Sequence, residues 1–144
     1  MKKFTFPLGR VMDFRRIEQR LEEIKLETLY AGLLAMDTRE AALIQKRVQS
    51  EKSLKSAASA TGEELQIFNA YGLAMKEEIK RMEKTRAECR KRIEAQLAVV
   101  TAKRREVKLL EKLKEQRFEK WEKEMFKEID NQAEEVYLAK WNAR

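Results

Sequence analysis

The chain has 144 residues, of which 40% are charged, and it carries only four glycines, one proline and a net charge of +7. This composition favours long helices with charged faces, and the sequence has no apolar run of about 18 residues that could span a membrane. Histidine is absent and Cys89 is the only cysteine. The usual general base and the commonest metal ligand are therefore missing, and one cysteine cannot build a zinc site. We expect no catalytic, cofactor-binding or metal-binding residues.

The N-terminal residues predict the start of a long helix. Pro7 suits a first helical turn, where its missing N–H costs nothing. No apolar stretch or small-residue cleavage site follows the first lysines, so we expect no secretory signal peptide and a cytoplasmic protein. Apolar residues then recur in steps of three or four, which places them on one face of a helix. We expect this stripe to pack against a second helix: Val11, Phe14, Ile17, Leu21 and Ile24.

The apolar pattern then shifts phase and stops at one break. The shifted residues are Leu26, Leu29, Leu33, Met36 and Leu43, and a shift of this kind is typical of a stutter in a coiled coil. Residues 56–62 are small and polar, so we place the first helix at about 7–56 and a hinge at about 57–62. Thr61 and Glu64 form a capping-box pattern, which predicts the start of a second helix.

The second helix is predicted over about 63–141, because no proline interrupts the apolar spacing there. Cys89 falls on its stripe, and we expect it to be a small core residue. At about 1.5 Å per residue the two helices would be roughly 70 and 115 Å long, and a short hinge makes them antiparallel. The predicted fold is all-α: a single two-helix antiparallel coiled-coil hairpin over 1–144, with the second helix longer. Residues 118–144 would then lack a partner and offer an apolar interface.

Two motifs lie at opposite ends of the sequence. The first is an aromatic opening with Phe4, Phe6, Leu8, Val11 and Arg15, and the second is the LEKLKE-x-R block of Leu110–Arg117, followed by Asp130 and Ala133 in an Asp-x-x-Ala pattern. Together these motifs resemble the two ends of the flagellar export protein FliJ family. The resemblance covers nearly the whole chain, although Pro7 and Gly9 stand where helix formers are expected.

The resemblance implies a stalk-like coiled coil of the flagellar (type III) protein export apparatus. Its partners would be the export ATPase, the cytoplasmic domain of the membrane export gate and export chaperones, and it would associate peripherally with the inner membrane. The ATPase-facing part would be 4–17 with 110–141, with these candidates: Phe4, Phe6, Leu8, Val11, Phe118, Trp121, Met125 and Ile129. The gate-facing candidates would be Phe68, Tyr71 and Met75. We expect Tyr71 and Met75 to be mostly exposed.

Two other functions fit the sequence. The surplus of basic residues over 76–108 could attract nucleic acid, but no aromatic residue lies between Tyr71 and Phe118 to stack on bases. The chain could also be a generic coiled-coil scaffold that dimerises.

Overall fold

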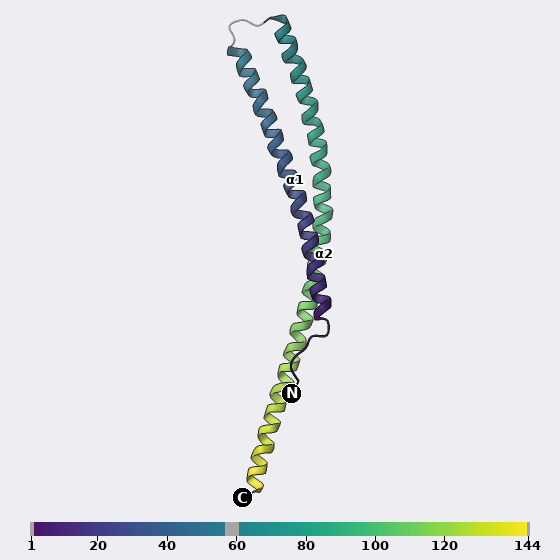
Figure 1. Cartoon of the computed structure of the whole chain (residues 1–144), viewed down its shortest axis with the longest axis vertical. Helices are drawn as coiled ribbons and strands as arrows, with labels where there is room; N and C mark the ends of the chain where they lie inside the picture. The colour runs from purple at the N-terminus through teal and green to yellow at the C-terminus, as the bar shows by residue number, and fades with distance from the viewer. Residues whose placement is uncertain (1, 57–60, 144) are drawn as a thin grey trace. The chain divides into compact units, whose positions relative to one another are not determined.

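The structure, a computed structural model, describes residues 2–56 and 61–143 (Figure 1). Helix α1 spans Gly9–Ser56 and helix α2 spans Gly62–Asn142, and no strand occurs among the described residues. The predicted all-α hairpin with a longer second helix is confirmed. Most of the predicted hinge lies outside the described residues. Neither helix holds a segment long and apolar enough to cross a membrane, as far as the chain is described.

The starts of the two helices differ in how well the sequence predicted them. The capping box is confirmed, because the Glu64 amide donates to Thr61 Oγ1 at 3.2 Å and the Thr61 amide donates to Glu64 Oε2 at 3.4 Å. Helix α1, in contrast, starts two residues after Pro7. Pro7 and Leu8 lie in a turn, which is closed by a 3.0 Å hydrogen bond from the Gly9 amide to the Phe6 carbonyl.

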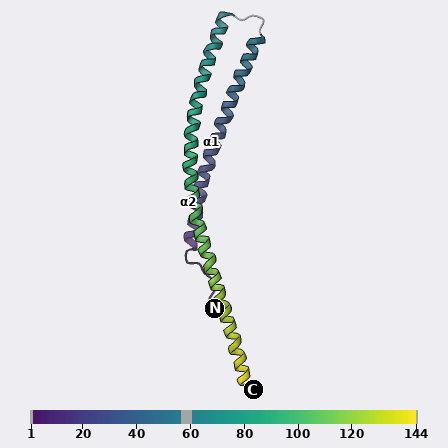
Figure 2. The same ribbon diagram turned by 180° about the vertical axis from the view of Figure 1, so that it is seen from behind.

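The chain divides into two compact units. Unit 1 comprises Met1–Leu21 with Thr101–Arg144, and unit 2 comprises Glu22–Val100. Within each unit, a part of α1 lies antiparallel beside a part of α2, as Figures 1 and 2 show from opposite sides. The core of unit 2 contains Cys89, as predicted, together with these residues: Leu26, Leu29, Leu33, Met36, Ile93 and Val100.

The covered residues of α1 form one uninterrupted seam. From Met12 to Leu54, buried or half-buried positions recur in alternating steps of three and four, which is the heptad spacing of a coiled coil. The predicted stutter is therefore wrong. The seam is continuous because several of its positions are polar, and a search for apolar residues passes over them. Those positions include Arg15, Gln19, Glu22 and Glu40.

The first apolar stripe of α1 does not pack against α2. The side chains of Phe14 and Ile17 are 57% and 59% exposed, and Val11, Leu21 and Ile24 are also exposed. The polar seam residues take the interface instead, because they find partners on α2. In unit 2, for example, Gln96 Nε2 donates to both the Glu22 carbonyl at 2.9 Å and the Glu22 carboxylate at 2.6 Å. The expectation that this stripe faces α2 is wrong.

A single cysteine substitution tests the hairpin. Cys89 Sγ lies 3.7 Å from the Leu29 carbonyl oxygen, to which it donates a weak hydrogen bond. Because the Cys89 thiol lies against the backbone of Leu29, Leu29→Cys should form a disulfide with Cys89 inside one chain on oxidation. Non-reducing electrophoresis of the oxidised chain should show a monomer of altered mobility. Leu34→Cys is the control, since Leu34 is 67% exposed. If Leu29→Cys gives only linked dimers, the antiparallel hairpin is wrong.

Candidate partner-binding surfaces

Three aromatic side chains from the two ends of the chain form a cluster in unit 1. The ring centroids of Phe4 and Phe118 are 5.2 Å apart with an interplanar angle of 82°, an edge-to-face contact. Trp121 completes the cluster, with its centroid 5.8 Å from Phe4 and 5.6 Å from Phe118. Pairs with these spacings are favoured by the ring quadrupoles, beyond the apolar area that they bury. We call Phe4, Phe118 and Trp121 the aromatic cluster.

Two polar contacts hold the N-terminal segment beside the cluster. Trp121 Nε1 donates to the Lys2 carbonyl at 3.1 Å, and the Arg117 guanidinium lies 5.8 Å from the centroid of the Phe6 ring, in range for a cation–π interaction. The sequence did not reveal either contact. The expectation that 118–144 has no partner within the chain is therefore wrong for Phe118 and Trp121.

A group of four charged side chains holds α1 to α2 in the same unit. Arg15 Nη1 donates to Glu18 Oε2 at 2.9 Å, and Lys103 Nζ lies 3.4 Å from the same oxygen. The hydrogen bond from Arg15 lowers the pKa of Glu18, and Lys103 lowers it further. The same hydrogen bond raises the pKa of Arg15, as does the nearby charge of Glu106. Both shifts favour the ionised forms of Arg15 and Glu18.

The other predicted ATPase-facing residues lie outside the aromatic cluster. Leu8 and Met125 are half-buried, whereas Val11 is 44% and Ile129 is 50% exposed. The residues from Ile129 to Ala143 are exposed without a gap. Apolar surface that a chain leaves uncovered on this scale is typical of an interaction site.

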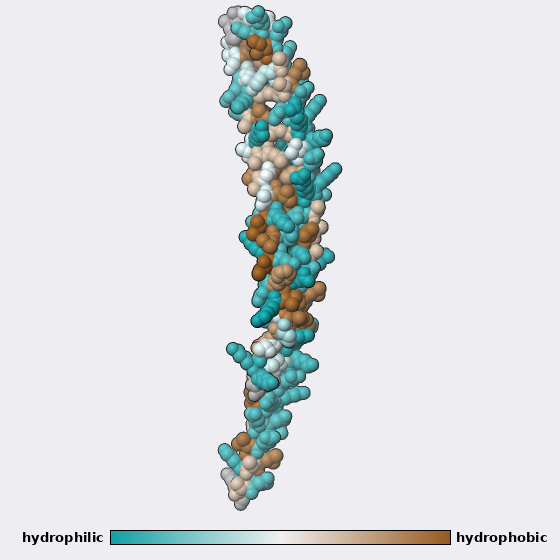
Figure 3. Space-filling model, turned by 45° about the vertical axis from the view of Figure 1, so that its right-hand side comes forward, coloured by the Kyte–Doolittle hydropathy of each residue, from teal (hydrophilic) through white to brown (hydrophobic). Residues whose placement is uncertain are grey.

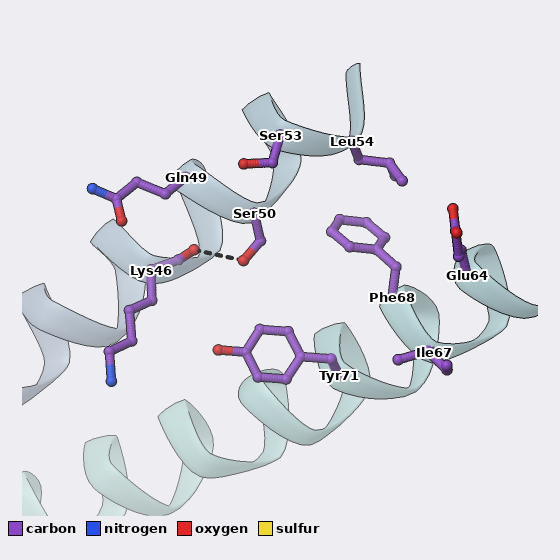
Figure 4. Close-up of a pocket in the computed structure, with 9 residues that line it drawn as sticks. All are labelled: Lys46, Gln49, Ser50, Ser53, Leu54, Glu64, Ile67, Phe68 and Tyr71. Carbon is purple, nitrogen blue, oxygen red and sulfur yellow. Dashed lines mark hydrogen bonds between the residues drawn. The ribbon is translucent and has the colours of Figure 1, made fainter. Parts of the chain in front are cut away.

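Unit 2 contains an open groove between the last turns of α1 and the first turns of α2 (Figure 4). Its volume is about 640 Å³, and α2 contributes the aromatic rings of Phe68 and Tyr71. Figure 4 shows both rings pointing from α2 toward α1. Seam positions here carry small residues, Ser50 on α1 and Gly72 on α2, so little fills the space between the helices. The lining from α1 consists of Lys46, Gln49, Ser50, Ser53 and Leu54.

The structure separates the three predicted gate-facing residues. Tyr71 is 43% exposed, as expected, and Phe68 is half-buried in the groove. Met75, however, is only 4% exposed, so the expectation that it faces solvent is wrong. It lies three residues after Gly72 and four before Ile79 on the α2 seam. At such a position a side chain packs between helices and is not available to a partner.

No protein-family model, curated protein or solved structure matches the chain. The described residues also contain no group of three or more His, Cys, Asp or Glu side chains placed to hold a metal ion. The aromatic cluster of unit 1 and the open groove of unit 2 both expose aromatic rings from α2. Both offer large, rigid apolar side chains beside polar groups, the composition that is enriched where proteins bind proteins.

Proposed function

We propose that the protein is a non-enzymatic component of the flagellar (type III) protein export apparatus. In this role it is a stalk-like coiled coil that binds the export ATPase through unit 1 and the cytoplasmic domain of the export gate through unit 2. It also escorts export chaperones, and it works in the cytoplasm at the inner face of the membrane.

The contact between Arg117 and Phe6 carries this proposal. The two sequence blocks that resemble the FliJ family are almost a hundred residues apart, and each alone is a common type of coiled-coil sequence. Phe6 belongs to the first block and Arg117 ends the second, and the guanidinium lies 5.8 Å from the ring centroid. Residues that bind the same partner must lie close together, and the contact between Arg117 and Phe6 brings these two blocks together.

The groove of unit 2 supports the second half of the proposal. Tyr71 and Phe68 provide aromatic anchors of the kind that dominate binding energy in protein interfaces. The groove lies between the last described turns of α1 and the first turns of α2, and it contains two of the residues that the resemblance assigns to the gate, Phe68 and Tyr71.

Replacing Tyr71 tests the gate contact. Tyr71→Ala should weaken binding to the purified cytoplasmic domain of the gate by roughly tenfold, because a central aromatic anchor is lost. Binding to the ATPase should stay unchanged, since Tyr71 belongs to unit 2. The melting temperature should also stay close to that of wild type, because changes at exposed positions usually alter stability by less than about 0.5 kcal/mol. Titration calorimetry against each partner measures both affinities.

Tyr30→Ala is the matched control for this substitution. Tyr30 is a tyrosine of unit 2 with nearly the same exposure, 46% against 43% for Tyr71, and it does not line the groove. Tyr30→Ala should bind the gate like wild type. Equal effects of the two substitutions would contradict a gate site in the groove. A wild-type chain that binds neither partner would point instead to a generic scaffold, and salt-sensitive retention on nucleic acid would point to the basic surface.

A further inference from the structure

The α1 part of unit 1 has an uncovered apolar face. Val11, Phe14, Ile17 and Leu21 recur in steps of three or four, and each is between 44% and 59% exposed. We call these four residues the α1 stripe. Such spacing is that of a coiled-coil interface, yet the seam with α2 lies on other residues, among them Met12 and Arg15. This part of α1 therefore has the pattern for a second helical neighbour.

A second uncovered stripe lies on the last turns of α2. Phe126, Ile129, Ala133 and Val136 follow one another in steps of three, four and three, and all four are exposed. We call them the tail stripe. Their spacing also matches a heptad pattern. The α2 tail therefore carries the apolar stripe of a coiled-coil helix, with no second helix of the described chain packed on it. Figure 3 shows apolar patches on the surface, between hydrophilic side chains.

The surroundings of the two stripes carry opposite charge. Residues 1–20, around the α1 stripe, hold six basic and two acidic side chains, whereas 122–140, around the tail stripe, hold six acidic and three basic ones. Such charges favour contact between the two stripes and oppose contact of either stripe with its own copy. An acidic apolar helix is thus the best-matched occupant for the α1 stripe, and this chain carries one.

We infer that the tail stripe of one copy packs on the α1 stripe of a second copy. A stable specific interface buries about 1,200 Å² or more in total, and four half-exposed side chains on each side fall short of that. Two reciprocal contacts double the buried area and close the assembly as a symmetric dimer, the commonest form of oligomer. This dimer covers Val11 and Ile129, which the proposed function assigns to the ATPase, although the inference does not depend on that function.

Sedimentation of the full-length chain over a range of concentrations tests this dimer. Wild type should pass from monomer to dimer as its concentration rises, and added salt should shift the midpoint upward because it screens the charge attraction. Ile17→Glu and Val136→Glu should each weaken dimerisation at least tenfold, since each places a charge in an apolar contact. Leu34→Glu is the matched control, because Leu34 is a 67% exposed apolar residue of unit 2, and it should dimerise like wild type.

Cross-linking of mixed chains identifies which stripes meet. In a Cys89→Ala background, an affinity-tagged Ile17→Cys chain is mixed with an untagged Val136→Cys chain and oxidised. Mixed Ile17→Cys/Val136→Cys dimers should outnumber both kinds of like-with-like dimer. The inference is overturned if wild type stays monomeric, if Ile17→Glu dimerises like wild type, or if like-with-like dimers dominate. No export partner is used, so the outcome is separate from that of the proposed function.

Discussion

Replacing Glu40 with leucine should destabilise the hairpin by about 3 kcal/mol, because it leaves a covered arginine without its main partner. The Arg86 side chain is 15% exposed and pairs with Glu40, which is 16% exposed. Arg86 Nε also lies 2.9 Å from Asp37 Oδ1, but it makes no hydrogen bond. Asp37 alone therefore cannot satisfy the guanidinium. Thermal unfolding followed by circular dichroism measures the loss.

Two further variants separate the ion pair from general effects of substitution. The double variant Glu40→Leu with Arg86→Leu should recover most of the stability, because an apolar pair often replaces a buried ion pair without loss. Glu77→Leu breaks an ion pair with Arg81 in which both side chains are more than 70% exposed, and it should cost less than about 1 kcal/mol. If Glu40→Leu melts like Glu77→Leu, the covered pair contributes no more than a surface pair.

Trp121→Ala should weaken binding to the purified export ATPase, the partner proposed for unit 1, by on the order of tenfold or more, because large aromatic anchors contribute most to interface energy. The substitution removes the ring contacts with Phe4 and Phe118 and the hydrogen bond to the Lys2 carbonyl. It therefore also releases the N-terminal segment that presents Phe4 and Phe6. Pull-down and titration against the ATPase measure the effect, and circular dichroism of the free variant should show most of the helix retained.

The chain provides a matched control for Trp121. Trp141 is the other tryptophan, it is 63% exposed, and Trp141→Ala should bind the ATPase like wild type. Phe4→Ala should reproduce much of the Trp121→Ala effect, and the double variant should lose less than the sum, since the two rings are in contact. ATPase binding of Trp121→Ala at wild-type strength would exclude the aromatic cluster as the binding site.

Local signals in the sequence predicted most of the fold. The capping box of Thr61 and Glu64 placed the start of α2 within one residue, because its two hydrogen bonds involve only neighbouring residues. The prediction that Cys89 is a core residue was also correct, because its neighbours on the α2 seam, Met82 and Ile93, are apolar and buried. In such segments the apolar pattern and the packing coincide, and the sequence alone is sufficient to predict where a helix starts and which side chains are buried.

The first part of α1 shows where that reasoning fails. Phe14 and Ile17 form a more regular apolar stripe than Met12 and Arg15, yet the latter pair lies on the seam. The choice depends on partners across the interface, such as Glu106 for Arg15, and hydrophobic periodicity does not register them. The same holds for the aromatic cluster. The resemblance gave Phe4, Phe118 and Trp121 as binding candidates, but their contacts with one another depend on the path of the chain through the turn at Pro7 and Leu8.

The exposure of the last turns of α2 affects the binding free energy of any partner that packs on them. From Ile129 onward every described residue is exposed, so the helix there depends on its own backbone hydrogen bonds and local side-chain pairs. The segment continues from the packed part of α2, but no packing within the described chain opposes fraying at its free end. A partner that packs on this segment therefore restricts fraying of the helix end, and the lost conformational entropy offsets part of the contact energy. Complexes formed on this segment should therefore be readily reversible.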